Sequence, residues 1–298
     1  MKNVTFTGKM RIIAVIVICF CRGTDVSAQE QERYEISVGG GFGLSTLQYK
    51  MKTGERKDGT GGTFGVSGSY FFNDGLGIRT GLEMSLYKAE SNVASISDRY
   101  MAHDGKDEFE FRSVINEYTE KQSLMTLEIP LLLQLQYPLF DEQFIFFSFG
   151  GKVAFPMNAY YKTSGSDLVT SAYYPKYDIV LNGPVFQGLG AFRSNKVKED
   201  LDFKPAFMLS GEVGLKWEIA ESFSLYSGFY IDYGLNDIRK KVRNQPFLIY
   251  NQQNPAHYVN NSVLNTQYTH EGKTDAFTKK IMPMAVGIKI RVAFRIDE

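Results

Sequence analysis

Cysteine, tryptophan and histidine are scarce in this sequence, and long apolar runs are almost missing. Its 298 residues include two cysteines, one tryptophan and three histidines. Both cysteines, Cys19 and Cys21, lie in an N-terminal apolar segment, so the rest of the chain can form no disulfide. After that segment no apolar run approaches the roughly 18 residues that a membrane-spanning helix needs, which excludes a helical membrane protein.

Charge of one sign is not in excess either. The chain has 33 basic and 33 acidic residues, and no block of lysine and arginine stands out. A nucleic-acid partner is therefore not indicated, because the sequence has no basic cluster to neutralise phosphates.

The N-terminus has the three-part layout of a secretory signal peptide. Basic residues occur within Met1–Arg11, an apolar run follows at Ile12–Cys21, and Val26-Ser27-Ala28 is a small-residue cleavage site. We expect residues 1–28 to be removed and residues 29–298 to form one outer-membrane β-barrel domain with a net charge of about −3. A permanent N-terminal anchor is the alternative, which the short apolar run disfavours.

One stretch, Leu124–Leu139, shows what kind of domain follows. Every second residue from Met125 to Tyr137 is apolar or aromatic, whereas Thr126, Glu128 and Gln134 fall on the opposite face. A period of two indicates a β-strand, because successive side chains leave opposite faces of the pleat. Its length exceeds that of an ordinary strand and suits a bilayer-crossing strand of about 9–11 residues.

Seven further segments alternate in the same way. The eight expected strands are Tyr34–Tyr49, Thr63–Asn73, Gly77–Lys88, Leu124–Leu139, Gln143–Pro156, Asp202–Glu218, Phe223–Leu235 and Ile281–Ile296. The connections between them alternate between long and short, as in transmembrane barrels with long extracellular loops and short periplasmic turns. The sequence thus predicts an all-β fold: a closed antiparallel up-and-down transmembrane β-barrel of about eight strands.

A soluble barrel or sandwich with the apolar faces turned inward is the competing interpretation. Two features favour lipid. The polar faces are rich in glycine, serine and charges of both signs, which suits a narrow interior. Aromatic residues also collect near the strand ends, where a membrane girdle is expected: Tyr34, Tyr49, Tyr70, Phe72, Tyr87, Tyr137, Trp217 and Phe223.

Pro130 lies in the middle of the expected barrel strand Leu124–Leu139. Proline cannot donate a ladder hydrogen bond, and a closed barrel has no edge strand to hold it. We therefore predict a local irregularity in strand pairing at this residue.

The residues Leu127–Leu133, LEIPLLL, resemble an element of the PorT-like outer-membrane β-barrel family. The signal peptide, the glycine-rich first strand, Phe149-Gly150-Gly151 and a last strand ending near Phe294-Arg295 are similar to that family as well. The resemblance implies an outer-membrane barrel of about eight strands in a Gram-negative envelope. It implies no activity, because the family is functionally mixed and offers no shared catalytic motif.

Charged residues on the inward faces form the main candidate site. We expect a buried ion-pair network, centred on Glu83 and Glu128 of neighbouring strands, among Arg79, Glu83, Glu128, Glu212, Asp232, Lys289 and Arg291. An eight-stranded barrel is just wide enough to be filled by side chains, so a network is favoured over a channel. Removing one partner, as in Glu128→Ala, should then cost about 3–5 kcal/mol of stability.

Chemistry elsewhere is weakly indicated. The histidines His103, His257 and His270 have no partner at metal-ligand spacing, and no Ser, His and Asp set can be assembled. Asp104, Asp107, Glu108 and Glu110 lack the calcium-loop spacing and are interpreted as a solvated acidic loop. The glycines of Gly39–Gly43 are followed by more strand and not by the helix that a dinucleotide loop requires. We expect no catalytic, cofactor-binding or metal-binding residues.

The longest connection is rich in tyrosine. Its candidate contact residues are Tyr160, Tyr161, Tyr173, Tyr174 and Tyr177. Exposed tyrosines can bind an extracellular or envelope protein or a glycan, and they can equally pack the loop over the barrel mouth. The sequence therefore favours a non-enzymatic outer-membrane barrel with a structural or interaction role; a narrow pore for small solutes and a rim-active enzyme are the alternatives.

Overall fold

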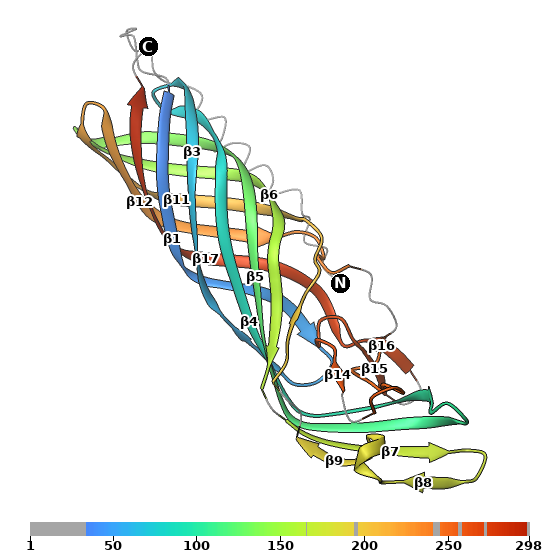
Figure 1. The fold of residues 1–298 in the computed structure, drawn as a ribbon. Coiled ribbons are helices and arrows are strands. Elements are labelled where there is room, and N and C mark those ends of the chain that lie inside the picture. Colours follow the sequence, from blue (N-terminus) through green and yellow to red (C-terminus); the bar gives the residue numbers. More distant parts are fainter. Residues whose placement is uncertain are drawn as a thin grey trace, which may run out of the picture. The chain divides into compact units, whose positions relative to one another are not determined.

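The computed structural model describes residues 34–164, 166–193, 196–240, 245–255, 258–270 and 273–296. Eight long strands form a ring (Figure 1). They are β1 (Tyr34–Met51), β3 (Thr60–Asn73), β4 (Leu76–His103), β5 (Glu108–Phe140), β6 (Gln143–Thr163), β11 (Ala206–Ala220), β12 (Phe223–Gly234) and β17 (Thr278–Ile296). The predicted signal peptide, residues 1–28, lies outside the described residues.

Each ring strand pairs with the next in an antiparallel ladder, in the order β1, β3, β4, β5, β6, β11, β12, β17. The ladder between β1 and β17 closes the ring and runs from Tyr34 opposite Ile296 to Met51 opposite Thr278. The predicted all-β antiparallel barrel is confirmed. No helix among the described residues is long and apolar enough to span a bilayer.

Connections at one end of the ring, here called the turn end, are short. Asp74-Gly75, Asp141-Glu142 and Glu221-Ser222 join consecutive strands there, and both β1 and β17 have their outer termini at this end. At the first of these turns Asn73 Oδ1 accepts hydrogen bonds from the N–H groups of Gly75 and Leu76. The opposite end, the loop end, carries every long connection.

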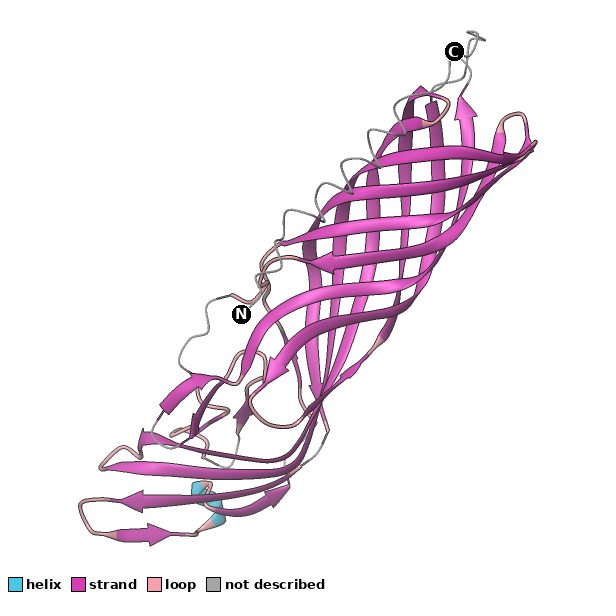
Figure 2. Cartoon of the chain, turned by 180° about the vertical axis from the view of Figure 1, so that it is seen from behind, coloured by secondary structure: helices cyan, strands magenta, loops and turns pink. Residues whose placement is uncertain are grey.

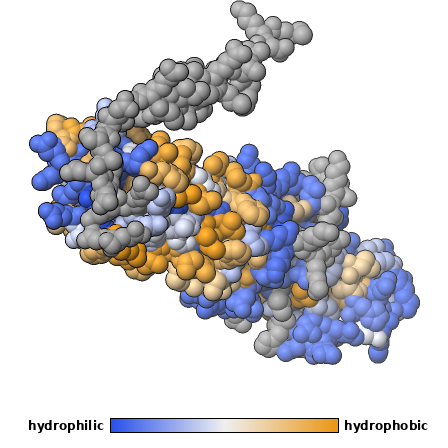
Figure 3. All heavy atoms as spheres, turned by 90° about the horizontal axis from the view of Figure 1, so that it is seen from above, coloured by the Kyte–Doolittle hydropathy of each residue, from blue (hydrophilic) through white to orange (hydrophobic). Residues whose placement is uncertain are grey.

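Side chains of the ring strands alternate between the two faces over most of their length. Large apolar residues point outward: Phe42 is 67% exposed, Phe64 63% and Leu131 59%. Figure 3 shows a zone of hydrophobic surface on this face of the molecule, with hydrophilic surface on both sides of it. We call this outward apolar zone the apolar belt. Charged and small polar residues of the same strands are buried inside the ring.

The segments expected to be irregular loops are largely strands. The strands β4 and β5 continue past the ring as a hairpin whose ladder reaches His103 opposite Glu108 (Figure 2). In that region β5 leaves β6 and pairs with β7, which in turn pairs with β8 and β9. We call the outer parts of β4 and β5, together with β7, β8 and β9, the loop-end sheet.

The remaining short elements also lie in connections that were expected to be irregular. They are β2 (Glu55–Asp58), β7 (Asp167–Tyr174), β8 (Ile179–Leu181), a 3₁₀ turn η1 (Val185–Gln187), β9 (Gly190–Arg193), β10 (Lys198–Asp200), β13 (Leu248–Ile249), β14 (Val259–Asn260), β15 (Gln267–His270) and β16 (Lys273–Ala276).

The loop-end sheet packs on a hydrophobic core that continues into the ring. Alternate residues of its strands are buried, among them Val93, Ile96, Phe109, Phe111, Ile115, Tyr118, Leu168 and Ala172. Four residues from the connection between β12 and β17 pack against them: Phe247, Leu248, Val263 and Leu264. The rings of Tyr118 and Phe247 meet edge to face with their centroids 4.9 Å apart. This packing explains why the hairpin continues as regular sheet beyond the ring.

Three residues depart from their expected places. Tyr49 and Tyr87 do not belong to an aromatic girdle, because they fall on the inward rows and are buried in the barrel. Phe203, which falls within the expected strand Asp202–Glu218, precedes β11 and is also buried. Pro205 interrupts the pattern between Phe203 and the strand, so the alternation of β11 does not extend back to Phe203.

The irregularity predicted at Pro130 is present on one side of its strand. In the ladder between β4 and β5 the pair Thr80–Leu131 is followed by the pair Glu83–Glu128. Pro130 and Ile129 are therefore unpaired with β4, although the register on both sides is the same. The hydroxyl of Thr80 donates to the Pro130 carbonyl over 2.8 Å. Towards β6 the pairing stays regular at Pro130, which lies opposite Lys152. The missing N–H is thus accommodated by a short break in a single ladder.

Candidate functional sites in the barrel interior and at the loop end

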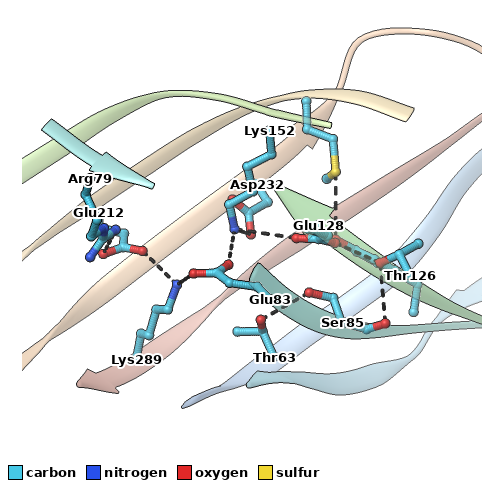
Figure 4. A network of polar contacts seen from close by, with 12 residues as sticks. Thr63, Arg79, Glu83, Ser85, Thr126, Glu128, Lys152, Glu212, Asp232 and Lys289 are labelled. Atoms are coloured by element: carbon cyan, nitrogen blue, oxygen red, sulfur yellow. Dashed lines mark hydrogen bonds and ion pairs between the residues drawn. The ribbon is translucent and has the colours of Figure 1, made fainter. Parts of the chain in front are cut away.

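Lys152 is the central cation of the barrel interior. It projects from β6, and its Nζ lies 2.7 Å from Glu83 on β4 and 2.9 Å from Asp232 on β12 (Figure 4). A third carboxylate, Glu128 on β5, is 3.6 Å away. Four strands are therefore joined through one buried ammonium group.

The ion pairs continue from Glu83 across the interior. The second oxygen of Glu83 lies 2.6 Å from Lys289 on β17. Lys289 lies 2.8 Å from Glu212 on β11, and Glu212 lies 2.6 Å from Arg79 on β4. All four side chains are at least nine-tenths buried. The chain of contacts alternates in charge sign, so each buried charge has an opposite neighbour.

Six of the seven predicted network residues are therefore brought together. Arg291 is placed differently: its guanidinium lies 4.1 Å from the centroid of the Tyr226 ring and donates to Gln134 over 3.3 Å. Among the described residues Arg291 forms no ion pair. Glu83 and Glu128 are direct register partners, yet they are bridged by Lys152 and not by Arg79.

Glu128 is held mainly by hydroxyl groups. Tyr87 donates to its Oε1 over 2.7 Å and Thr126 over 2.8 Å. Its Oε2 and Asp232 Oδ1 accept no hydrogen bond from any described residue. Tyr87 was assigned to the girdle in the sequence, although it follows Glu83 and Ser85 on the same inward row.

A second charged group fills the interior nearer the turn end. Lys216 lies 3.0 Å from Glu35 and 3.3 Å from Glu218, and the Tyr226 hydroxyl donates to Glu35 over 2.7 Å. Arg295 pairs with Glu218 as well. Sequence reasoning missed this group and Lys152, although Glu35, Lys152 and Lys216 all fall on inward rows.

Little space remains between these side chains. A cavity beside Glu212, Tyr226, Lys289 and Arg291 has a volume of about 10 Å³, which is room for about one water molecule. The interior at this level is packed with paired charges and aromatic rings.

At the loop end a buried carboxylate fastens the connection before β17 to the base of the hairpin. Glu120 accepts hydrogen bonds from Tyr118 over 2.6 Å, Gln122 over 2.8 Å and the N–H of Val263 over 3.0 Å, and from the Ser262 hydroxyl. Burial raises the pKa of Glu120 above its ordinary value, although these donors oppose the shift. Within the described part of the chain Glu120 has no ion-pair partner.

The tip of the hairpin is fastened to the turn between β7 and β8. Tyr174 donates to Asp104 over 2.8 Å, Lys176 to Asp107 over 2.9 Å and Tyr177 to Asp107 over 3.2 Å. The hydrogen bond from Lys176 lowers the pKa of Asp107. Burial opposes a fall in the pKa of Asp104, but hydrogen bonds from the backbone N–H groups of Asp107 and Lys106 lower it.

The five candidate tyrosines therefore divide. Tyr174 and Tyr177 join the loop-end sheet to itself, and Tyr173 donates to Asp178 over 3.0 Å. Tyr161 is buried and donates to the Asn260 carbonyl over 2.5 Å. Tyr160 faces outward from β6, with Lys198 Nζ 4.7 Å from the ring centroid.

The other sequence candidates are placed as follows. His103 is exposed and accepts the N–H of Gly105 on its Nδ1 over 2.9 Å. His257 and the His270 side chain lie outside the described residues. Among residues that the structure describes, no three His, Cys, Asp or Glu side chains are arranged to hold a metal ion. Glu110 pairs with Arg112 over 2.6 Å, and Glu108 is exposed.

Comparison with known proteins shows which family this chain belongs to. A sequence model described as the outer membrane protein beta-barrel domain matches residues 27–240. The chain belongs to this family. It is a protein of the outer membrane, and the apolar belt of the ring faces outer-membrane lipid. The loop end is accordingly the extracellular end and the turn end the periplasmic one.

Several solved structures are similar at low identity. The Neisserial surface protein A is 7% identical, with 88% of this chain and 97% of that chain covered and a TM-score of 0.33. OprG from Pseudomonas aeruginosa is 12% identical over 89% and 98% of the chains, with a TM-score of 0.36. Ail, the attachment invasion locus protein of Yersinia pestis, is 9% identical over 88% and 99%, with a TM-score of 0.24. A comparison with curated protein sequences finds no match.

Proposed function

We propose that this protein is a non-enzymatic outer-membrane barrel that presents a rigid extracellular sheet for binding another protein. The observation that carries the proposal is the loop-end sheet, which packs on a hydrophobic core and whose described strands end at the edge strand β8. A sheet stiffened in this way holds its surface in one conformation, which reduces the entropy lost on binding.

The edge strand β8 is the surface that suits a partner. Its residues Ile179 and Val180 are 51% and 47% exposed, and Phe186 of the neighbouring turn is 74% exposed. Natural edge strands are usually protected by lysine, proline or a bulge, and Ile179–Leu181 contains neither lysine nor proline. An extended segment of another protein can add to such an edge by main-chain hydrogen bonds.

Site-specific crosslinking tests this surface. A photoreactive phenylalanine analogue at position 186 should yield a discrete protein adduct on intact cells. The same analogue at the exposed Met101 of β4, away from β8, is the control. The proposed contact surface would be wrong if position 186 gave no adduct, or if both positions gave the same adducts.

The charged interior supports a barrel that does not conduct. Lys152, Glu83 and Glu212 meet their partners in the middle of the ring, where a solute would have to pass. We expect planar bilayers with the refolded mature protein to show no steady single-channel current, with a known porin as the positive control. Steady currents would instead favour the pore for small solutes.

Two finer assignments belong to the same proposal. The LEIPLLL element, Leu127–Leu133, supports membership of the PorT-like group within the outer-membrane barrels. The layout of residues 1–28 supports secretion with cleavage after Ala28. Intact mass measurement of the protein from outer membranes should give a chain that begins at Gln29; a chain that retains Met1–Ala28 would contradict the cleavage.

A further inference from the structure

Four lysines and one glutamate lie side by side across three ring strands, β4, β5 and β6, and the short strands β2 and β10. The ladders place Lys57 of β2 opposite Glu90 of β4, Glu90 opposite Lys121 of β5, and Lys121 opposite Lys162 of β6. Lys198 of β10 lies opposite Lys162 on its other side. We call these four lysines the basic strip.

The basic strip faces outward, just beyond the apolar belt. Lys57 and Lys121 have 64% and 69% of their side-chain surface exposed, whereas Gln122 and Tyr161, the next residues along, point into the barrel. Along the same strands, Leu86 opposite Met125 is the last apolar row, and one row with Lys88 separates it from the strip.

Strand geometry sets the height of the strip above the hydrocarbon. Strands rise about 3.3 Å per residue and tilt by about 40°, so each two-residue step climbs roughly 5 Å along the membrane normal. The strip then lies about 10 Å beyond the last apolar row. The headgroup zone of a bilayer extends about 5–8 Å from the hydrocarbon, and flexible lysine side chains can reach back into it.

Within the described residues the strip is short of negative charge. Glu90 serves both Lys57 and Lys121, over 3.8 and 3.5 Å. Among the described residues Lys162 and Lys198 form no ion pair, and their Nζ atoms lie 5.4 and 4.7 Å from the centroid of the Tyr160 ring. Asp200 lies opposite Tyr160 in register but pairs with neither lysine. Like charges directly opposite on adjacent strands repel, so three consecutive lysines favour an external anion.

We propose that the basic strip binds the phosphate groups of an anionic lipid of the outer leaflet. The strip faces the membrane laterally and continues the surface of the apolar belt. A lipid whose phosphate binds the strip can therefore keep its acyl chains on Leu86 and Met125. Tyr160 lies between the two zones, where an amphipathic ring sits best. A soluble phosphate gains no such apolar contact. The inference is independent of the partner proposed for β8.

Lipid retention by the refolded mature barrel in detergent micelles tests the proposal. Native mass spectrometry measures the apparent affinity for bisphosphorylated lipid A and for the same lipid without phosphates. We expect the phosphorylated lipid to bind at least tenfold more tightly. Lys162→Gln/Lys198→Gln should weaken it by about fivefold for each lysine, the size expected of one basic residue at an anionic membrane surface.

Two matched variants complete the test. Lys162→Arg/Lys198→Arg keeps the charge and should retain the lipid. Lys106→Gln/Lys176→Gln removes the same charge from exposed positions at the hairpin tip and the turn after β7, and should also retain it. Equal binding of both lipids, or equal loss in the tip variant and the strip variant, would overturn the proposal. Inorganic phosphate competing at the concentration of the lipid would also overturn it, because the occupant would then be a soluble anion.

Discussion

Single charged residues in the interior hold several strands at once. Lys152 contacts carboxylates from three strands other than its own, so its loss leaves Glu83, Asp232 and Glu128 without their shared cation. Breaking a buried ion pair costs about 3–5 kcal/mol, because the remaining charge is left uncompensated. We therefore expect the removal of one member of the network alone to be strongly destabilising.

Replacing Lys152 should reveal this coupling. We expect Lys152→Met to lower the free energy of unfolding by about 3–5 kcal/mol. Adding Asp232→Asn removes an uncompensated charge and should recover part of the loss. Urea unfolding in lipid vesicles, read as a double-mutant cycle, measures the coupling. Strictly additive effects would show that the two residues do not act together.

Glycine is required where the closing strands approach each other. A Cβ on Gly43 would lie 2.2 Å from the Val286 carbonyl oxygen and 2.5 Å from the Gly287 Cα, whereas one on Gly68 would meet nothing within 4 Å. We expect Gly43→Ala to destabilise the barrel by about 1–3 kcal/mol and Gly68→Ala to leave it unchanged. Thermal unfolding of the two variants is the measurement, and equal melting temperatures would contradict the steric argument.

At the scale of residues, the sequence predicts which side chains face the barrel interior, but not which of them form ion pairs with each other. Period-two alternation already places Glu35, Lys152 and Lys216 on inward rows. Which of them meet depends on strand register and on which strands face each other across the ring, and neither is written in local alternation. The central role of Lys152 and the position of Arg291 over the Tyr226 ring could therefore not be predicted from the sequence.

At the scale of elements, the ring strands were predictable and the loop-end sheet was not. Ring strands carry long apolar rows because lipid wets one face. The hairpin arms of β4 and β5 bury one face against a small protein core and expose the other to water, so their average composition is polar. Glu108–Tyr118 nevertheless alternates, with Phe109, Phe111 and Ile115 buried. Because the average composition of this segment is polar, its two-residue alternation was not recognised as a strand.

The fastening of the connection before β17 should depend on pH. Because the pKa of Glu120 is raised above 4.5 on folding, its contribution to stability is complete below about pH 4.5 and is lost as pH rises through the folded pKa. We expect hydrogen exchange at residues 262–264, corrected for intrinsic rates, to be better protected at pH 5 than at pH 8.

Two glutamine variants separate the cause. Glu120→Gln should abolish the pH difference, since the group no longer titrates, and the exposed Glu117→Gln should keep it. A pH difference that survives in Glu120→Gln would assign it to another group, such as Asp98, which accepts the N–H of Phe247 and whose pKa is also raised by burial.

At the scale of the molecule, most of the ring is formed by strands that do not enter the hairpin arms. Of the eight ring ladders, only the one between β4 and β5 continues into residues 94–116. A variant with residues 94–116 replaced by a short turn should therefore still close the ring. We expect unheated samples to keep the shifted electrophoretic mobility of a folded barrel, and a fully unfolded mobility would contradict this expectation.

The seam between β1 and β17 sets a condition on biogenesis. The first strand finds its second neighbour more than 200 residues later, in the last strand of the chain. A polypeptide that stops short of Thr278 would have two unpaired strand edges, on β1 and on β12, and the outer faces of both strands are apolar. Such a fragment is a template for aggregation, so we expect that the chain must be held unpaired in the periplasm until the β17 segment has arrived.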